Sequence, residues 1–237
     1  MRVCVFDLDH TLISSPLDLV AMALDMRALL ESSQGPLPAR PERYRVGELI
    51  AYCRRQAPAL EEAVWAVALA HERQALGDAA LEPGAREALL GSQAAGWSTA
   101  VWTNNAREVS FTALERFGLL PHLDLVVTRD DMAALKPDPD GWRVIARRLA
   151  PAHAVVVGDS WVDGVAAAAA GVPFVAYRPD QAELTRRGVS PRASLTDLAA
   201  LPGWLTTFLL EGASTAPSKP PHSREVPPPT PVKRASN

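Results

Sequence analysis

Apolar and polar positions along the chain predict short strands separated by helices. Apolar runs that end in polar residues occupy residues 2–6, 98–102, 123–128, 154–157 and 173–176. Short apolar runs bounded by turn signals are typical of buried strands. Segments with helical spacing lie between them, at about 83–95, 106–117, 141–149 and 162–170. Strands that alternate with helices favour a parallel sheet with helices on both faces. We therefore expect an α/β fold.

A helical stretch interrupts this alternation after the first strand. Amphipathic spacing predicts helices over about 17–32, 42–55 and 59–76. Pro36, Pro38 and Pro41 separate the first two helices, and Pro58 separates the second from the third. The simplest organisation is a Rossmann-like core made of residues 1–14 and 80–212, with an inserted α-helical cap domain over 15–79.

The end of the chain differs in composition from the rest. From residue 213 onward Pro, Ser, Thr and basic residues dominate. Such a segment buries too little apolar surface to offset the entropy lost on ordering. We expect residues 213–237 to form a disordered Pro-rich tail.

Composition narrows the classes of partner and location. The 237 residues are 48% hydrophobic and 22% charged, with a formal net charge of -3. This charge provides no broad positive field for nucleic acid or an anionic membrane. Cys4 and Cys53 show no disulfide or metal-ligand spacing. No signal-peptide region precedes Asp7 and no apolar run is long enough to span a bilayer, so we expect a cytoplasmic protein. The sequence makes no prediction of oligomeric state.

Two carboxylates follow the first predicted strand. Asp7 and Asp9 are two residues apart, and in an extended segment such residues point the same way. The exit of a strand is also where open α/β sheets bind ligands. Paired carboxylates suit a hard cation such as Mg²⁺, and an aspartate beside the cation can attack phosphorus.

Polar residues also follow the later strands. They are Thr103, Lys136 and Asp159, with Asp163 one helical turn further on. Taken singly, Thr103 could be a helix N-cap, Lys136 a surface lysine and Asp163 an exposed helix residue. Their order and their shared position at the carboxyl ends of strands instead indicate one site.

These segments resemble a known family. The four motifs Asp7-Leu8-Asp9-His10-Thr11, Thr103-Asn104-Asn105, Lys136-Pro137-Asp138-Pro139 and Gly158-Asp159-Ser160-Trp161-Val162-Asp163 are similar to the signature motifs of the haloacid dehalogenase-like (HAD) hydrolase superfamily. The resemblance is strongest to its phosphoglycolate phosphatase-like branch, which carries a helical cap between the first two motifs. It covers about residues 1–200.

The resemblance implies roles for the acidic residues. Asp7 would be the nucleophile that forms an aspartyl-phosphate. Asp9 would protonate the leaving oxygen and then accept a proton from water. Mg²⁺ would be bound by the Asp7 carboxylate, the Asp9 backbone carbonyl and Asp159.

The resemblance also implies a phosphate-binding set. Thr103, the backbone N–H of Asn104 and Lys136 would hold the phosphoryl oxygens, and Leu8 belongs to the same set. Asp163 lies one helical turn beyond Asp159 and could hold Lys136 or a metal-bound water. The sequence favours this role over direct binding of the metal but does not decide between them.

The expected function is a Mg²⁺-dependent phosphatase that hydrolyses a small phosphorylated metabolite. The presence of Asp9 argues against a dehalogenase or a P-type ATPase, because these members of the superfamily lack an aspartate at that position. A phosphomutase of the same superfamily keeps both aspartates and stays an alternative. A phosphoprotein phosphatase shares the DLDHTL form of the first motif, although the helical insert and the later motifs disfavour it. The non-enzymatic alternative is a phosphate-responsive regulatory protein phosphorylated on Asp7.

Several nearby residues have two interpretations. His10 could sense substrate or pack locally, and Trp161 could line the pocket or pack on the sheet. Asn104 and Asn105 could contact substrate or cap a helix. The basic stretch with Arg40, Arg43, Tyr44 and Arg45 could read an anionic group of the substrate or be an exposed helix start.

Overall fold

A six-stranded sheet forms the centre of the computed structural model, which describes residues 1–214. Every neighbouring pair of its strands is parallel. The α/β fold predicted from the sequence is therefore confirmed. The strands lie in the order β5 (Leu125–Val127), β4 (Ser98–Trp102), β1 (Arg2–Phe6), β6 (His153–Gly158), β7 (Phe174–Tyr177) and β8 (Ala193–Leu195).

The alternation of side chains explains the central position of β1. Cys4 and Phe6 belong to the hydrophobic cluster on one face of the sheet, and Val3 and Val5 belong to the cluster on the other. All four are fully buried. An uninterrupted apolar run suits a strand that is covered on both faces, because successive side chains point to opposite sides.

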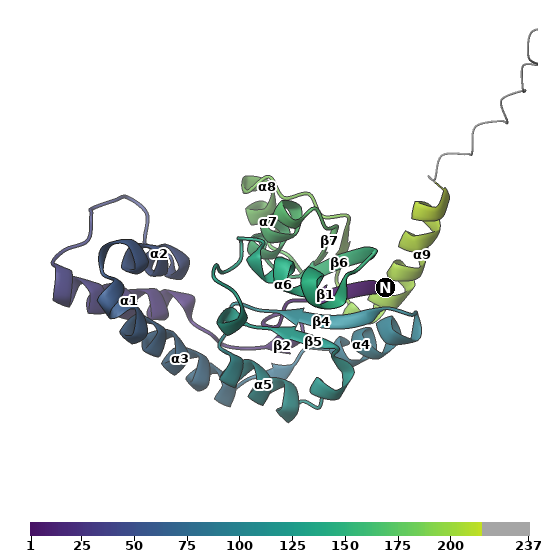
Figure 1. Cartoon of the computed structure of the whole chain (residues 1–237), viewed down its shortest axis with the longest axis horizontal. Coiled ribbons are helices and arrows are strands. Elements are labelled where there is room, and N and C mark those ends of the chain that lie inside the picture. The colour runs from purple at the N-terminus through teal and green to yellow at the C-terminus, as the bar shows by residue number, and fades with distance from the viewer. Residues whose placement is uncertain (215–237) are drawn as a thin grey trace, which may run out of the picture.

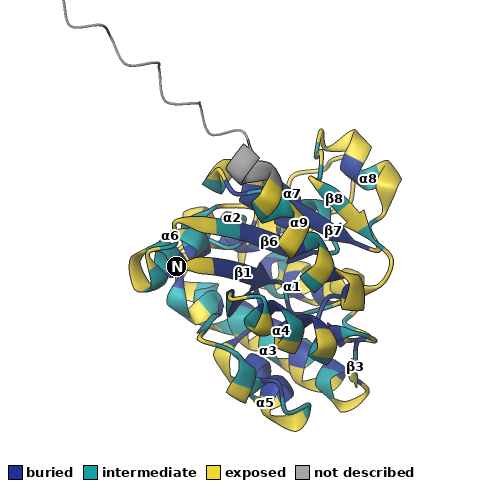
Figure 2. Cartoon of the chain, turned by 90° about the vertical axis from the view of Figure 1, so that its right-hand side faces the viewer, coloured by how far each residue is buried: buried dark blue, intermediate teal, exposed yellow. Residues whose placement is uncertain are grey.

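Helices cover both faces of the sheet (Figures 1 and 2). The first cluster is completed by α4 (Ala85–Ala94), α5 (Arg107–Arg116) and α9 (Leu201–Ser214). The second is completed by α6 (Asp140–Leu149), α7 (Trp161–Ala170) and α8 (Gln181–Arg186). Short 3₁₀ segments are η1 (Pro58–Leu60), η2 (Leu120–His122), η3 (Arg129–Asp131) and η4 (Leu198–Ala200).

Three further helices pack around a hydrophobic cluster of their own. They are α1 (Leu19–Gln34), α2 (Val46–Gln56) and α3 (Glu61–Gly77). Figure 1 shows them beside the sheet, with α3 passing close to α5. The chain enters this group through β2 (Ile13–Ser14) and leaves it through β3 (Ala80–Leu81), and the two strands pair antiparallel. Leu135 of the core packs against both this cluster and the second sheet cluster.

Some elements differ from the sequence-based expectation. The strand predicted over 98–102 is found there as β4, and the three inserted helices begin a few residues later than predicted. The strands β2, β3 and β8 and the helices α8 and α9 had not been predicted, and most of these are too short to show a periodic pattern. Helix α9 ends at Ser214 and so includes the first two residues of the predicted tail. The rest of the predicted tail lies outside the described residues.

Helix α6 lies tightly against Trp102, and this contact predicts a stability effect. Gly141 is buried in α6, and a Cβ atom there would overlap the fully buried indole of Trp102. Gly141→Ala should therefore lower the free energy of unfolding by about 1–3 kcal/mol, as overpacking does. Gly47→Ala in α2 is the matched control, because its Cβ meets nothing within 4 Å and alanine favours helix by about 1 kcal/mol. Thermal unfolding followed by circular dichroism compares the two, and equal melting temperatures would contradict the prediction.

Candidate active site

The sheet brings the predicted site residues together at one edge. Asp7, Thr103 and Asp159 directly follow β1, β4 and β6, which are neighbours in the sheet. Lys136 lies in the loop between β5 and α6. Because all strands are parallel, their carboxyl ends meet at the same edge, where α/β folds bind ligands.

The ammonium group of Lys136 is the central contact of the site. It donates hydrogen bonds to Asp7 Oδ1 at 2.5 Å, Asp163 Oδ1 at 2.6 Å and the Trp102 carbonyl at 2.8 Å. The side chain is only 4% exposed. All three N–H donors of the ammonium thus have acceptors inside the protein.

Asn104 fixes the backbone that carries Lys136. Its side-chain amide accepts the Lys136 N–H at 2.8 Å and donates to the Lys136 carbonyl at 3.1 Å. The side chain of Asn104 is therefore used within the protein, and only its backbone N–H is left for the predicted phosphate contact.

Burial and charge act in opposite directions on the pair of Asp7 and Lys136. Burial raises the pKa of Asp7 well above its ordinary value, and the nearby Lys136 opposes that shift. Burial alone would lower the pKa of Lys136, but the charges of Asp163 and Asp7 outweigh it and raise that pKa. Lys136 is therefore positively charged throughout the physiological pH range.

Asp163 is committed to hydrogen bonds within the site. One oxygen accepts from Lys136, and the other accepts the Ser160 hydroxyl at 2.6 Å and the Ser160 N–H at 3.2 Å. Gly158 makes this placement possible, because a Cβ atom there would lie 2.6 Å from Cγ of Asp163. The observed contacts agree with a residue that orients Lys136.

Three carboxylates form a group that fits a divalent cation. Oxygens of Asp7, Asp159 and Asp163 lie within 4.8 Å of one another. With all three ionised and Lys136 protonated, the group carries a net charge of -2 (three negative, one positive). Burial, followed by the charge of Asp163, raises the pKa of Asp159 to about 7. An all-oxygen, negatively charged donor set is what hard cations prefer.

Asp9 lies in different surroundings from Asp7. Its Oδ2 accepts a hydrogen bond from the Asn105 side-chain amide at 2.5 Å, and its carboxylate is not part of the three-carboxylate group. Burial raises the pKa of Asp9, and the bond from Asn105 opposes the shift. The backbone N–H of Asn105 donates in turn to Thr103 Oγ1 at 3.1 Å. The two aspartates of the first motif therefore occupy separate hydrogen-bond networks.

The remaining predicted residues lie close to this edge. Thr103 is buried, and the side chain of Leu8 is fully buried, so Leu8 can reach a ligand only through its backbone. His10 is exposed, has a left-handed φ of 55° and lies near enough to Asp9 to lower its pKa. Trp161 packs against the second sheet cluster, with the guanidinium of Arg187 4.3 Å from its ring centroid.

The basic stretch of the inserted helices divides into two kinds of residue. Arg40 pairs with Glu48 at 2.7 Å, and Tyr44 donates its hydroxyl to the Pro38 carbonyl at 2.8 Å. Both therefore hold their own loop. Arg45 instead reaches the core, with its guanidinium 5.5 Å from the Trp161 ring centroid.

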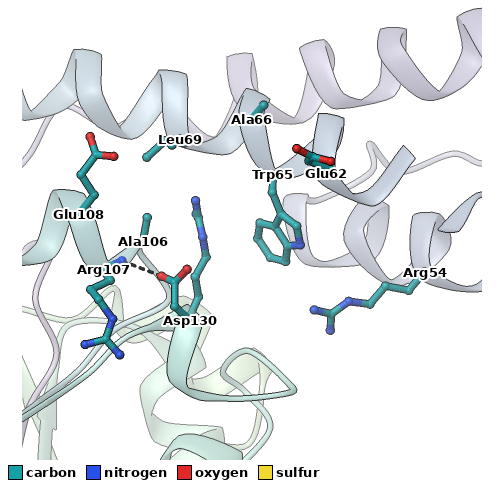
Figure 3. A pocket seen from close by; sticks show the side chains of 10 residues that line it. Arg54, Glu62, Trp65, Ala66, Leu69, Ala106, Arg107, Glu108 and Asp130 are labelled. Carbon is teal, nitrogen blue, oxygen red and sulfur yellow. Dashed lines mark hydrogen bonds between the residues drawn. The ribbon is translucent and has the colours of Figure 1, made fainter. Parts of the chain in front are cut away.

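A cleft of about 470 Å³ lies between part of the inserted helices and the core. Figure 3 shows Trp65 and Leu69 of α3 on one side and Ala106, Arg107 and Asp130 on the other. Its lining combines both signs of charge with apolar surface. Ala106 directly follows Asn105, so the cleft adjoins the loop that contacts Asp9.

Comparison with known proteins agrees with this geometry. Residues 1–171 match the family described as haloacid dehalogenase-like hydrolase. A plasmid-encoded phosphoglycolate phosphatase of Cupriavidus necator is 32% identical over 229 residues, covering 89% of this chain and 95% of that protein. A phosphoglycolate phosphatase of Cereibacter sphaeroides is 30% identical over 190 residues, covering 73% and 83%. The crystal structure of a predicted phosphoglycolate phosphatase from Haemophilus somnus superposes with a TM-score of 0.61 at 19% identity, covering 86% and 97%.

The chain belongs to the haloacid dehalogenase-like hydrolase family and is a hydrolytic enzyme. The family resemblance drawn from the four motifs is confirmed, including its closeness to phosphoglycolate phosphatases. Within residues 1–214, no helix has both the length and the apolar character needed to cross a membrane.

Two contacts of the site were not anticipated from the sequence. Asn105 was expected to contact substrate or cap a helix, whereas its side chain bonds Asp9. Glu72 of α3 accepts the N–H of Ala106 at 3.1 Å. Neither contact has a local signal, since each joins segments that are far apart in the chain.

The raised carboxylate pKa values predict how stability depends on pH. Asp159 has a folded-state pKa of about 7, above its ordinary 3.8, so its proton stabilises the fold at low pH. Without a divalent cation, this contribution should be fully present below the ordinary pKa of 3.8 and should be lost as pH rises from there through about 7. A divalent cation binds the deprotonated form and should raise the melting temperature clearly at pH 8 and little at pH 5.

Thermal unfolding in chelator and in excess cation at both pH values measures this effect. Asp159→Asn is the matched variant and should lose much of both the pH dependence and the cation effect. An equal cation effect at pH 5 and pH 8 would contradict the assignment of the site.

Proposed function

We propose that this hydrolase is a Mg²⁺-dependent phosphatase that acts on a small phosphorylated metabolite through an aspartyl-phosphate on Asp7. The observation that carries the proposal is the contrast between two neighbouring carboxylates. Asp7 accepts a hydrogen bond from Lys136 and belongs to the three-carboxylate group, whereas Asp9 lies outside that group and is bonded by Asn105. The relatives named phosphoglycolate phosphatase make 2-phosphoglycolate the first substrate to test. The cytoplasmic location predicted from the sequence stays a prediction.

The nucleophilic step uses the contacts around Asp7. Lys136 holds Oδ1 of Asp7 at 2.5 Å, which leaves the other oxygen to attack phosphorus. The positive charge of Lys136 and the hydroxyl of Thr103 would stabilise the phosphoryl oxygens as their charge redistributes. Asp7, Asp159 and the Asp9 carbonyl would hold Mg²⁺, which supplies positive charge beside the phosphoryl group.

Asp9 serves as the proton carrier of this proposal. Burial raises its pKa, which favours the protonated form that a general acid needs. It donates that proton to the leaving oxygen and, once ionised, accepts one from the water that hydrolyses the aspartyl-phosphate. The same carboxyl group thus serves both steps.

The helices α1, α2 and α3 would act as a cap that covers the site. Their two connections, β2 and β3, pair beside the segment that carries Asp7 and Asp9. Closure of such a group excludes water while the phosphoryl group is on its way to Asp7. Cap residues near the core would then select among substrates.

A screen of phosphomonoesters with and without Mg²⁺ tests the proposal. We expect phosphate release from small alkyl phosphates only when Mg²⁺ is present. Isomerisation of sugar phosphates without phosphate release would indicate a phosphomutase instead. A stable, stoichiometric phosphoprotein without turnover would indicate a regulatory protein.

Asp7→Asn should abolish turnover because the amide is nearly isosteric but cannot attack phosphorus. We expect kcat to fall by more than about a hundredfold, which corresponds to about 2.7 kcal/mol in the barrier. Asp78→Asn, at an exposed carboxylate after α3, is the control and should retain activity. Steady-state phosphate release measures both. Substantial activity of Asp7→Asn would mean that another residue attacks phosphorus.

Cap substitutions should separate substrate selection from loop stability. Arg45→Ala removes a guanidinium that reaches Trp161 at the edge of the site. It should lower kcat/KM for 2-phosphoglycolate, which carries a carboxylate, by up to about fivefold more than for phenyl phosphate, since one exposed charge is worth at most about 1 kcal/mol. Arg40→Ala is the control and should change both substrates by the same factor, because Arg40 pairs with Glu48. Equal factors for Arg45→Ala would contradict the selecting role.

A further inference from the structure

Asn105 is held in place by three hydrogen bonds. Its side-chain amide donates to Asp9, its N–H donates to Thr103 Oγ1, and its carbonyl accepts the Arg129 N–H at 3.1 Å. The residue is only 8% exposed. The direction of its amide toward Asp9 therefore depends on where the backbone on either side of it is held.

Glu72 holds that backbone from the cap. Its Oε2 accepts the N–H of Ala106, the residue after Asn105, at 3.1 Å. Its Oε1 accepts a hydrogen bond from the guanidinium of Arg129. The backbone N–H of Arg129 in turn donates to the Asn105 carbonyl. One carboxylate on α3 thus contacts both segments that fix Asn105.

The burial of this ion pair distinguishes it from other contacts across the same boundary. The side chains of Arg129 and Glu72 are 8% and 4% exposed. The next residue along α3, Arg73, pairs with Glu108 of α5, but these side chains are 56% and 55% exposed. An exposed pair contributes little, and a buried pair is costly to desolvate and is weak evidence for stability. Fixed geometry is the better explanation for the buried pair.

We infer that Glu72 is a positioning residue of the cap, which orients Asp9 for proton transfer by holding Ala106 and Arg129 and, through them, Asn105. The inference rests on the proposed phosphatase function. Its consequence is that protonation of the leaving oxygen depends on the seating of α3 against the core. By contrast, formation of the aspartyl-phosphate from a substrate whose leaving group needs no protonation does not depend on the seating of α3.

Two substrates with different leaving groups separate these effects. Nitrophenolate leaves p-nitrophenyl phosphate with little help from an acid, whereas an alkyl phosphate needs the proton of Asp9. The experiment measures kcat/KM with Mg²⁺ for p-nitrophenyl phosphate and for the best alkyl phosphate of the screen. The proteins are the wild type, Glu72→Gln, Glu72→Asp, Asn105→Ala and the control Arg73→Gln.

The expected result is a selective loss. Glu72→Gln and Asn105→Ala should lower kcat/KM for the alkyl phosphate by at least about tenfold, within the range of general acid catalysis, and for p-nitrophenyl phosphate by less than about threefold. Glu72→Asp keeps the charge but has a shorter side chain, and it should give the same pattern. It replaces Glu72→Gln as the test if that variant does not fold. Arg73→Gln should change neither value by more than about twofold.

The outcomes separate the inference from the function on which it rests. Equal losses on both substrates would mean that Glu72 is merely structural, and an unchanged Asn105→Ala would mean that Asp9 needs no such partner. Either result overturns the inference while the phosphatase function stands. A wild type that hydrolyses neither substrate would overturn the proposed function itself.

Discussion

The buried ammonium of Lys136 is the constraint on which the proposed catalytic edge depends. It bridges Asp7, which directly follows β1, and Asp163 of α7, and it bonds the Trp102 carbonyl at the end of β4. Removing one partner of a buried ion pair typically costs about 3–5 kcal/mol, because the other charge is left without compensation. Three separate segments are therefore held in register by one side chain. The glycine at 158 and the amide of Asn104 serve the same arrangement, since one admits Asp163 and the other orients Lys136.

Two aspartates separated by one residue acquire different properties from their surroundings. Burial raises the pKa of both. The upward shift of the Asp7 pKa is opposed chiefly by the full charge of Lys136. The upward shift of the Asp9 pKa is opposed chiefly by a hydrogen bond from the neutral amide of Asn105. Neighbouring carboxyl groups in such unlike environments can take unlike roles, one as nucleophile and the other as acid and base. The fold thus gives different surroundings to two residues of the same type that lie two positions apart in the chain.

Most of the fold and of the candidate site that could be predicted from the sequence followed from the pattern of apolar strands. Apolar runs in the sequence predicted the central strands. Because parallel strands end at the same edge of a sheet, the sequence also predicted that Asp7, Thr103 and Asp159 lie close together. The Asn105–Asp9 and Glu72–Ala106 contacts were out of reach, because their spacing in the chain carries no periodic signal. The use of the Asn104 side chain on Lys136 was missed for the same reason. Short strands such as β2 and β3 lack the length that a pattern needs.

The pairing of β2 with β3 also bears on how the chain can vary. Register places Ile13 opposite Leu81 and Ser14 opposite Ala80, so the ends of the inserted segment are adjacent whatever lies between them. The entropy lost in closing a loop grows only slowly with its length, by about 0.6 kcal/mol for each doubling. The core therefore tolerates insertions of very different size at this point. A different inserted segment can be acquired, lengthened or replaced without disturbing the order of strands that builds the proposed catalytic edge.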